Sequence, residues 1–351
     1  MRWALLRVIR TFTVSFLPLS NEDTMKKVVL DIFGADAGTG AMIEGAHAVL
    51  DRHPEIGMVL VGDRADIENY GSLEKYGDRL EIIHADDFIT NTDPASCVFN
   101  GRETSSMVQA LKKLKEDPDC VGLLSPGSTG ALMVGSIFRV GLIQGLKMPA
   151  LSTSLPRVDG KMVCLVDCGA NVNCTEKDLL TFGLLGDAYA KVMYRLEAPR
   201  VGLMSVGTER TKGNELTLKA YPLLEEANIN FIGNIEGSDL IMGKADVVVS
   251  DGFSGNILLK SHETAGQIAM HILKKEMQKS PEHVASMQNA YEQLAYLYDL
   301  NVRGGATFLG TKKPVIKMHG VAVARTVVSC TEQLLMLDDN GFSEGIKNIL
   351  S

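Results

Sequence analysis

The sequence predicts an α/β protein whose sheet is mostly parallel and covered by helices on both faces. Strand-like and helix-like segments alternate from Lys27 to the C-terminal end, which is typical of repeated strand–helix–strand units. Hydrophobic residues make up 45% of the 351 residues, so the chain can bury a large core. Neither an internal repeat nor a low-complexity linker interrupts the alternation. Residues 25–351 are therefore expected to form one domain.

The expected strands of the first half are short runs of apolar and β-branched residues. They cover 28–32, 56–61, 80–84, 121–125, 149–153 and 162–167. Between them, apolar residues recur at helical spacing over 42–50 and 107–114. A further helix is expected over 129–143, where small residues allow close packing. Another begins at a capping box that opens with Thr175, and it continues to 196.

The second half repeats this rhythm. Strands are expected over 201–206, 229–233, 246–250 and 315–318, and helices over 215–226 and 321–337. One segment differs, because two long helices, 263–279 and 282–298, follow one another around Ser280-Pro281. Each carries an apolar stripe, so this helical hairpin packs either against a second copy or partner, or on its own domain.

The formal net charge of −8 argues against nucleic acid as a partner, because phosphates along a strand require a basic excess. Cys164, Cys168 and Cys174 have neither zinc-ribbon nor Cys-x-x-Cys spacing. Cys168 precedes a glycine loop and could be a reactive thiol, but packing is the simpler role. A reduced, cytoplasmic protein accounts for these cysteines.

Residues 1–24 differ from the rest of the chain. They carry three arginines and no acidic residue before Glu22, and the arginines interrupt every apolar run. No run is therefore long enough to cross a bilayer. A signal-like or interfacial segment is an alternative. Because Met25-Lys26-Lys27 directly precedes a strand, we expect 1–24 to be an extension outside the fold.

The motifs of several enzyme classes are absent. The sequence has no GxxxxGK[ST], no properly spaced GxGxxG and no HExxH. Gly252-Phe253-Ser254-Gly255 is one residue short of the GxSxG pattern. We therefore expect no nucleotide cofactor and no metal.

Loops rich in glycine, hydroxyl and amide groups follow many of the expected strands. They cover 34–38, 125–130, 167–171, 207–214, 233–237 and 251–256. Backbone N–H groups together with Ser, Thr, Asn and Lys side chains suit a phosphate or another small oxyanion. Each loop alone is weak evidence, since turns favour the same residues. Where strand ends converge, the loops together predict an anion site.

The loop 251–256 is central to this prediction. It leaves a buried strand and enters a helix, and two glycines, Gly252 and Gly255, would let a ligand approach the backbone. The first turn of the helix offers free N–H groups to an anion. The alternative is a tight turn with a helix cap and no ligand.

Several of these segments carry a resemblance to a known family. They are GSTGALMVGS (127–136), LVDCGANVNC (165–174), VGTERTKGNELTLKAYPLL (206–224), INFIGNIEG (229–237) and ADVVVSDGFSGNILLK (245–260). RETSSM (102–107) and RGGATFLG (303–310) also follow in the expected order. With these motifs the chain resembles the PlsX-type phosphate acyltransferases from about Met25 to its C-terminal end.

The resemblance implies a three-layer α/β/α sandwich related to phosphotransacetylases and isocitrate dehydrogenase-like enzymes, with a projecting helical hairpin at about 263–298. It implies transfer of a fatty acyl group from acyl-carrier protein to inorganic phosphate, giving acyl phosphate for phospholipid synthesis. It also implies a homodimer in the cytoplasm, with peripheral association at the inner face of the membrane through the hairpin.

This reaction needs no nucleophile from the protein, because phosphate itself attacks the thioester carbonyl. The site must hold the phosphate dianion in line and donate hydrogen bonds to the tetrahedral oxyanion. Phosphate contacts are expected from Lys212, Asn214 and the loop 128–130, and a proton carrier from His319. The asparagines of the loops would orient substrate, and Asp36 and Asp251 would fix donor groups. The expected site residues are Asp36, Ser128, Thr129, Gly130, Asn171, Lys212, Gly213, Asn214, Asn234, Glu236, Asp251, Gly252, Gly255, Asn256 and His319. Each Asn or Asp has an alternative role as a helix cap.

Some loops depart from the family pattern. The usual Asp-Ala-Met-Gly-Gly-Asp is replaced by Asp-Ile-Phe-Gly-Ala-Asp over 31–36, and Ser128 stands where Asn is usual. Thr208 stands where Glu is usual, and the usual His-Gly-Ser-Ser is His-Gly-Val-Ala over 319–322. Two alternatives therefore stay open. One is a phosphotransacylase that uses coenzyme A and short acyl groups, and the other is a non-catalytic relative that binds acyl-carrier protein or membrane.

Overall fold

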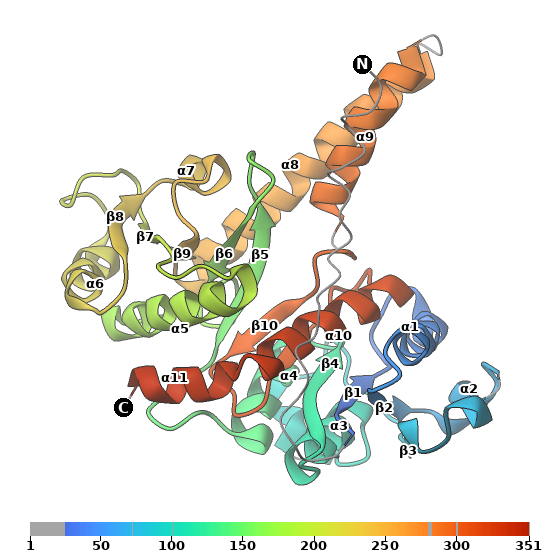
Figure 1. The fold of residues 1–351 in the computed structure, drawn as a ribbon. Coiled ribbons are helices and arrows are strands. Elements are labelled where there is room, and N and C mark those ends of the chain that lie inside the picture. Colours follow the sequence, from blue (N-terminus) through green and yellow to red (C-terminus); the bar gives the residue numbers. More distant parts are fainter. Residues whose placement is uncertain (1–24, 72, 100, 280–282, 300, 351) are drawn as a thin grey trace.

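The computed structural model describes residues 25–71, 73–99, 101–279, 283–299 and 301–350. The expected extension 1–24 lies outside the described residues. One continuous sheet of 11 strands forms the centre of the molecule (Figure 1). Across the sheet the strands are β3 (Leu80–His84), β2 (Gly57–Gly62), β1 (Lys27–Asp31), β4 (Cys120–Ser125), β11 (Val315–Lys317), β10 (Ala306–Leu309), β5 (Ala150–Pro156), β6 (Met162–Val166), β9 (Val247–Val249), β7 (Val201–Met204) and β8 (Phe231–Ile235).

Alternate residues of each strand enter cores on opposite faces of the sheet. In β1, Val28 and Leu30 pack into one core and Val29 into the other, because successive side chains of a strand point to opposite faces. In β6, Val163 packs into the core on one face and Cys164 into the core on the other. The near-continuous apolar runs of the sequence arise because both faces are buried.

Helices cover both faces, which confirms the three-layer α/β/α sandwich. One face is covered by α1 (Gly38–Arg52), α5 (Glu176–Tyr194), α6 (Glu215–Glu226), α10 (Ala324–Asp339) and α11 (Phe342–Leu350). The other is covered by α3 (Ser106–Glu116), α4 (Thr129–Gly135), α7 (Gly237–Met242) and the first part of α8 (Gly252–Lys279). The short α2 (Arg64–Glu68) lies beside β2 and β3.

The two halves of the sheet run in opposite directions. The pairs β11–β10, β10–β5 and β5–β6 are antiparallel, while the strands on either side of them are parallel. One row across the sheet joins Ser125, Lys317 and Ala306, and the next row joins Thr307, Ser152 and Val166. The carboxyl ends of β4 and β11 therefore reach the middle from one side, and that of β6 reaches it from the other.

This arrangement places the glycine-rich loops at different distances from the centre of the sheet. Loops after β4 and β11 meet the loop after β6 near the centre of the sheet, because their strands end within neighbouring rows. The loops after β7 and β8 follow strands farther out, toward the edge formed by β8.

Several expected boundaries also change. The helix expected over 129–143 ends earlier, because α4 passes into a π-helical turn, Ser136–Val140, and Gly141 then has φ +93°. The short β10 was not predicted, since its strand signal follows two glycines. Residues 252–256 of the expected loop 251–256 form the first turn of α8.

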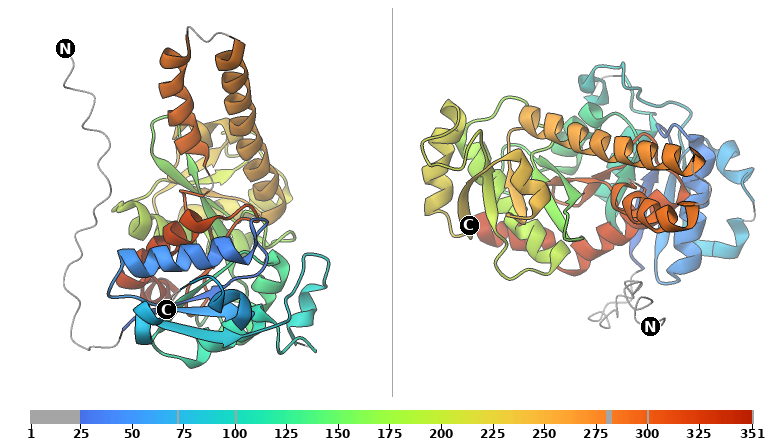
Figure 2. Two further views of the ribbon diagram at one scale, coloured as in Figure 1. Left: turned by 90° about the vertical axis from the view of Figure 1, so that its right-hand side faces the viewer. Right: turned by 90° about the horizontal axis from the view of Figure 1, so that it is seen from above.

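The helical hairpin is confirmed and projects from the sheet as two antiparallel helices, α8 and α9 (Val284–Tyr298) (Figures 1 and 2). They pack closely at the base, where a Cβ on Gly266 would lie 1.9 Å from the ring of Tyr298. Ile268, Ile272 and Tyr296 remain 55%, 56% and 64% exposed. The hairpin therefore does not bury these side chains on its own domain. None of the described helices is long and apolar enough to cross a membrane.

Candidate active site

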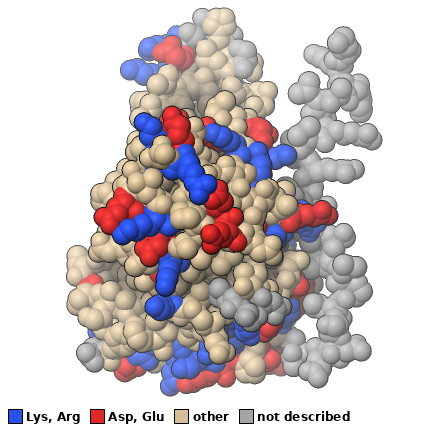
Figure 3. All heavy atoms as spheres, turned by 90° about the vertical axis from the view of Figure 1, so that its left-hand side faces the viewer, with Lys and Arg blue, Asp and Glu red and all other residues tan. Residues whose placement is uncertain are grey.

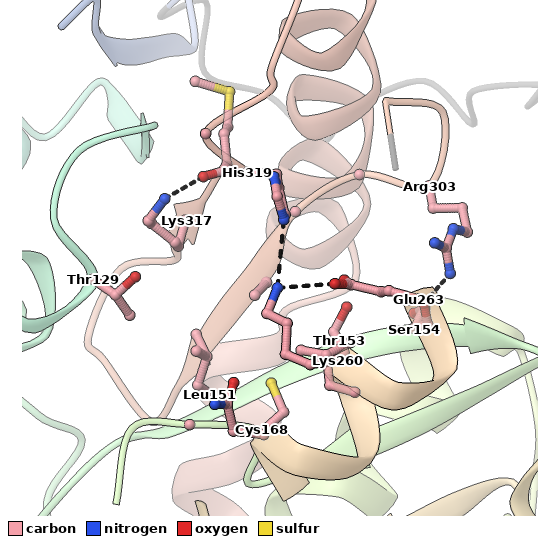
Figure 4. A pocket seen from close by; sticks show the side chains of 18 residues that line it. Thr129, Leu151, Thr153, Ser154, Cys168, Lys260, Glu263, Arg303, Lys317 and His319 are labelled. Atoms are coloured by element: carbon pink, nitrogen blue, oxygen red, sulfur yellow. Dashed lines mark hydrogen bonds and ion pairs between the residues drawn. The ribbon is translucent and has the colours of Figure 1, made fainter. Parts of the chain in front are cut away.

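A cavity of about 310 Å³ lies where the oppositely directed strands meet, between β5, β10, β11 and the first half of α8 (Figure 4). Its walls come from segments far apart in the sequence. They are Thr129, Leu151, Thr153, Ser154, Cys168, Gly169, Asn256, Leu259, Lys260, Glu263, Arg303, Gly304, Gly305, Ala306, Lys317, Met318, His319 and Gly320. The cavity thus joins the predicted loops 125–130, 167–171 and 251–256 to the segment around His319.

The loop after β6 is folded by a buried carboxylate. Asp167 accepts hydrogen bonds from the backbone N–H groups of 169–171, at 3.1, 3.1 and 2.6 Å. The side chain of Asn171 donates to Asp167 at 2.7 Å and to the carbonyl of Pro149 at 2.8 Å. Burial raises the pKa of Asp167, while these donors oppose the rise. Cys168 and Gly169 are thereby held in the wall of the cavity.

The first turn of α8 packs directly on this loop. A Cβ on Gly255 would lie 1.9 Å from the carbonyl oxygen of Asp167, and one on Gly252 would lie 2.6 Å from that of Asn171. The close approach that was expected for a ligand is therefore made by the chain's own backbone. The glycines bring α8 close enough to line the cavity.

One face of α8 then points into the cavity. Asn256, Lys260 and Glu263 stand at positions i, i+4 and i+7, which share a helix face. The Nζ of Lys260 lies 2.8 Å from Oε2 of Glu263 and 3.5 Å from Nε2 of His319 (Figure 4). Burial, and then the charge of Lys260, lower the pKa of His319. The imidazole is therefore neutral at pH 7.

Lys317 enters from the end of β11. Its ammonium donates to the carbonyl of Pro126 at 3.0 Å and to that of Met318. Burial lowers the pKa of Lys317 to about 8, and the nearby charge of Lys260 acts in the same direction. A partly buried ammonium of this kind is stabilised by an anion at its side.

Arg303 enters from the turn before β10. Its Nη1 donates to the carbonyl of Ser154 at 3.4 Å. Its Nε and Nη2 are buried and have no hydrogen-bond partner within the described ranges. Burial lowers the pKa of Arg303. Donors without partners are costly when buried, so this guanidinium is poised to bind an oxyanion.

The charges of the wall favour an anion. Lys260, Arg303 and Lys317 are cations, and Glu263 is the one carboxylate among the described residues that line the cavity. The cavity therefore carries a net positive charge in a protein of net charge −8. In the described part of the chain, no group of His, Cys, Asp and Glu could hold a metal ion.

Three of the predicted site residues line the cavity: Thr129, Asn256 and His319. Ser128 and Gly130 flank Thr129 at the start of α4. Asp36 lies behind the cavity wall, where its N–H donates to the carbonyl of Gly320 at 2.7 Å.

The other predicted residues lie outside the cavity wall, and several have structural partners. Asn214 caps α6 by accepting from the N–H of Thr217 at 2.9 Å, and Asp251 accepts from the N–H of Ser254 at 2.9 Å at the start of α8. The N–H of Glu236 donates to Asp239 at 3.0 Å before α7. The contacts of Asn214 and Asp251 are the capping alternative that the sequence left open.

The loop 207–214 is stabilised by its own contacts. Asn234 is buried in β8, and its side chain donates to the carbonyls of Glu209 and Lys212 at 2.8 and 3.3 Å. Gly213 has φ +128°, and a Cβ there would lie 2.1 Å from Oγ1 of Thr217. The Lys212 side chain is exposed. The structure thus gives most of this loop a structural role and does not bring it to the cavity wall.

The predicted site did not include Lys260, Glu263, Arg303 and Lys317, which line the cavity. A helical signal could have found the first two, because Asn256, Lys260 and Glu263 repeat at i, i+4 and i+7. Lys317 is a charged residue inside a strand of apolar residues, which is a further signal. Arg303 had no comparable pattern beyond the two glycines after it.

Comparisons with known proteins support the resemblance. The family model described as "Fatty acid synthesis protein" matches residues 26–344. A phosphate acyltransferase of Lysinibacillus sphaericus is 39% identical over 310 residues, covering 88% of this chain and 93% of that protein. One from Caldanaerobacter subterraneus is 36% identical over 324 residues, covering 92% and 96%.

Solved structures share the fold. A phosphotransacetylase from Streptococcus pyogenes superposes with a TM-score of 0.61 at 13% identity, covering 90% of this chain and 94% of that one. A branched-chain phosphotransacylase from Enterococcus faecalis gives 0.59 at 15% identity, covering 90% and 99%. At this identity the likeness concerns the fold alone. The family match and the similarity of the relatives together show that the chain belongs to the fatty acid synthesis protein family, as a phosphate acyltransferase-type member.

Proposed function

We propose that this protein is a phosphate acyltransferase that moves a fatty acyl group from the thioester of acyl-carrier protein to inorganic phosphate. One observation assigns the reaction to a particular site. The cavity at the centre of the sheet gathers Lys260, Arg303 and Lys317 around a space of about 310 Å³. The family and the relatives named phosphate acyltransferase support the reaction class.

Phosphate binds between these cations. Arg303 donates from Nε and Nη2, which have no partner within the described ranges, and Lys317 supplies a partly buried ammonium. Lys260 also lines the space, where it pairs with Glu263. Charge-assisted hydrogen bonds from a guanidinium suit the oxygens of phosphate, and the low polarity of a buried site strengthens them.

The reaction transfers the acyl group from the thioester sulfur to a phosphate oxygen. A phosphate oxygen attacks the thioester carbonyl carbon, and a C–O bond forms while the carbonyl oxygen becomes an oxyanion. The oxyanion collapses, the C–S bond breaks, and the thiolate leaves with the electron pair. The proton that phosphate carried passes to the thiolate through His319, which is neutral in the resting site.

Donors at the rim stabilise the oxyanion. Asn256 from α8 and Thr129 from the start of α4 both line the cavity. Holding phosphate and thioester in line removes much of the entropic barrier, and each oxyanion donor contributes about 10²–10³ in rate. The residues of the loop 207–214, with Lys212 foremost, remain a second candidate contact for substrate.

The proposed partners follow from the chemistry of the substrate and from the surface. Acyl-carrier protein presents the thioester, and two copies of the chain associate through the exposed apolar side chains of the hairpin. Basic and acidic side chains are intermingled over the described part of the face in Figure 3, so an acidic carrier protein must use a local basic group. Lys274, Lys275 and Lys279 on α8 are candidates. Peripheral contact of the hairpin with a membrane surface belongs to the same proposal.

The test is direct. The full chain is incubated with acyl-carrier-protein thioester and inorganic phosphate, and acyl phosphate is trapped with hydroxylamine. The proposal expects hydroxamate that forms only when both phosphate and protein are present. Parallel reactions with coenzyme A thioesters identify the alternative donor. Absence of phosphate-dependent product for every chain length and both donors would exclude the activity and favour a binding protein.

A further inference from the structure

Gln333 contacts the cavity wall from the opposite face of the sheet. It lies on α10, while α8 and the cavity lie on the other side. The N–H of Gly305 donates to Oε1 of Gln333 at 2.8 Å, and Nε2 donates to the carbonyl of Gly305 at 3.1 Å. One side-chain amide therefore holds both polar backbone groups of a residue in the wall.

The turn 303–305 is shaped around this amide. Gly304 has φ +85°, and a Cβ there would lie 2.1 Å from Oε1 of Gln333. A Cβ on Gly305 would lie 2.7 Å from the carbonyl oxygen of Lys317. Any side chain at either position would push the turn away from α10 or from β11. The Arg-Gly-Gly sequence thus lets the turn lie between them.

Gln333 is itself fixed. The residue is 7% exposed, and Nε2 also lies 2.9 Å from Oγ1 of Thr307 and 3.1 Å from the hydroxyl of Tyr189, so its two N–H groups are shared among three acceptors. Buried polar networks with satisfied partners are rigid. The amide is therefore a fixed point against which the turn is placed.

We infer that Gln333 is a positioning residue for phosphate, because it fixes the turn that presents Arg303 to the cavity. The inference rests on the proposed function, in which Arg303 contacts phosphate. The guanidinium has a single long hydrogen bond, to Ser154, within the described ranges, so its place depends on its backbone. A displacement of about 1 Å in such a contact costs about 10² in rate.

The test uses Gln333→Met, which keeps the volume and removes the amide. Thr331→Val is the matched control, because Thr331 is buried on the same helix and its hydroxyl has no partner within the described ranges. Isothermal titration with inorganic phosphate gives the dissociation constant, and the hydroxylamine assay gives kcat and KM. Gln333→Met is expected to weaken phosphate binding and to lower kcat/KM for phosphate by about 10²-fold. Thr331→Val is expected to match the unaltered protein in both.

A double-mutant cycle with Arg303→Met separates positioning from general damage. If Gln333 acts through Arg303, adding Gln333→Met to Arg303→Met produces no further loss of phosphate binding, although the melting temperature falls. Additive losses, or an unchanged dissociation constant in Gln333→Met, overturn the inference. If Gln333→Met does not fold, Gln333→Glu serves in the same cycle, since it keeps one oxygen for the Gly305 N–H.

Calorimetry with the unaltered protein distinguishes a failure of the proposed function from a failure of the inference on Gln333. Phosphate binding without acyl transfer by the unaltered protein overturns the proposed function and leaves the inference on Gln333 to the cycle. No phosphate binding by the unaltered protein overturns both.

Discussion

Lys260 and Glu263 form an ion pair of 2.8 Å across one turn of α8, inside the cavity. Glu263 is the one carboxylate of the described cavity wall and it pairs with Lys260, so the wall offers no second carboxylate to Arg303 or Lys317. The site therefore keeps positive charge that an anion can neutralise. Lys260 also faces His319, so it links the charge of the site to the protonation of the imidazole.

Replacing Lys260 with Met tests this link. The change removes a cation and a hydrogen-bond donor, so kcat/KM for phosphate is expected to fall by about 10²-fold. The pKa of His319 is expected to rise, because the charge of Lys260 lowers it. Acyl phosphate assays and NMR titration of the imidazole measure the two effects. Lys112→Met, an exposed lysine on α3, is the control, and equal losses in both variants contradict the assignment.

The pH dependence of phosphate binding follows from Lys317. Its pKa is lowered to about 8, so the ammonium is charged below that pH and neutral above it. Since phosphate binds the charged form, KM for phosphate is expected to rise as the pH increases from 8 to 10. Lys317→Met is expected to raise KM at pH 7 and to remove this rise. A KM that stays constant over this range in the unaltered protein shows that Lys317 does not contact phosphate.

Lys212 and Arg303 distinguish the two positions offered for phosphate. The motif around Lys212 predicts a phosphate contact, whereas the cavity wall contains Arg303 and not Lys212. Arg303→Met is expected to lower kcat/KM for phosphate by about 10²-fold, and Lys212→Ala to change it by less than about threefold. A larger loss of kcat/KM in Lys212→Ala than in Arg303→Met would show that phosphate binds at the loop 207–214.

The sequence predicted the layers of the fold because alternation and apolar runs are local signals. It placed Thr129, Asn256 and His319 in one site, and the structure brings these three together. Arg303 and Lys317 could not be placed, since their meeting depends on the antiparallel register of β10 and β11. That register joins strands whose directions no local pattern specifies.

Other predicted residues lie outside the cavity wall because they stabilise the fold. Asn and Asp cap helices and bind ligands with the same side-chain oxygens, so sequence alone cannot separate the roles. Asn214 and Asp251 each accept a backbone N–H at the start of a helix. Gly252 and Gly255 are required by contacts with the loop after β6. A glycine allows the close approach of a ligand or of a neighbouring backbone, so the sequence alone does not separate these two roles.

Asn214→Ala tests whether the cap is the main role. Removing the hydrogen bond to Thr217 is expected to lower the free energy of unfolding by about 1 kcal/mol. The melting temperature should then fall by about 1–2 °C, since the entropy of unfolding grows with chain length. Activity at 25 °C is expected to stay within about twofold, since Asn214 lies outside the cavity wall. Calorimetry and the acyl phosphate assay measure these values, and a large loss of activity in a fully folded variant restores Asn214 to the site.

The exposed apolar side chains of the hairpin predict how two copies of the chain associate. Ile268 and Ile272 are four residues apart on α8, so they share a face, and both are more than half exposed. Exposed apolar stripes of this kind are buried by a second copy or a lipid surface.

Replacing both Ile268 and Ile272 with Asp is expected to convert a dimer into a monomer, because burying two carboxylates in an apolar contact is costly. Analytical ultracentrifugation measures the mass. Gln267→Asp, an exposed polar position on the same helix, is the control, and it is expected to remain dimeric. A dimer that persists in the double variant places the contact elsewhere. A monomer in the unaltered protein, with loss of vesicle binding in the variant, assigns the stripe to the membrane surface.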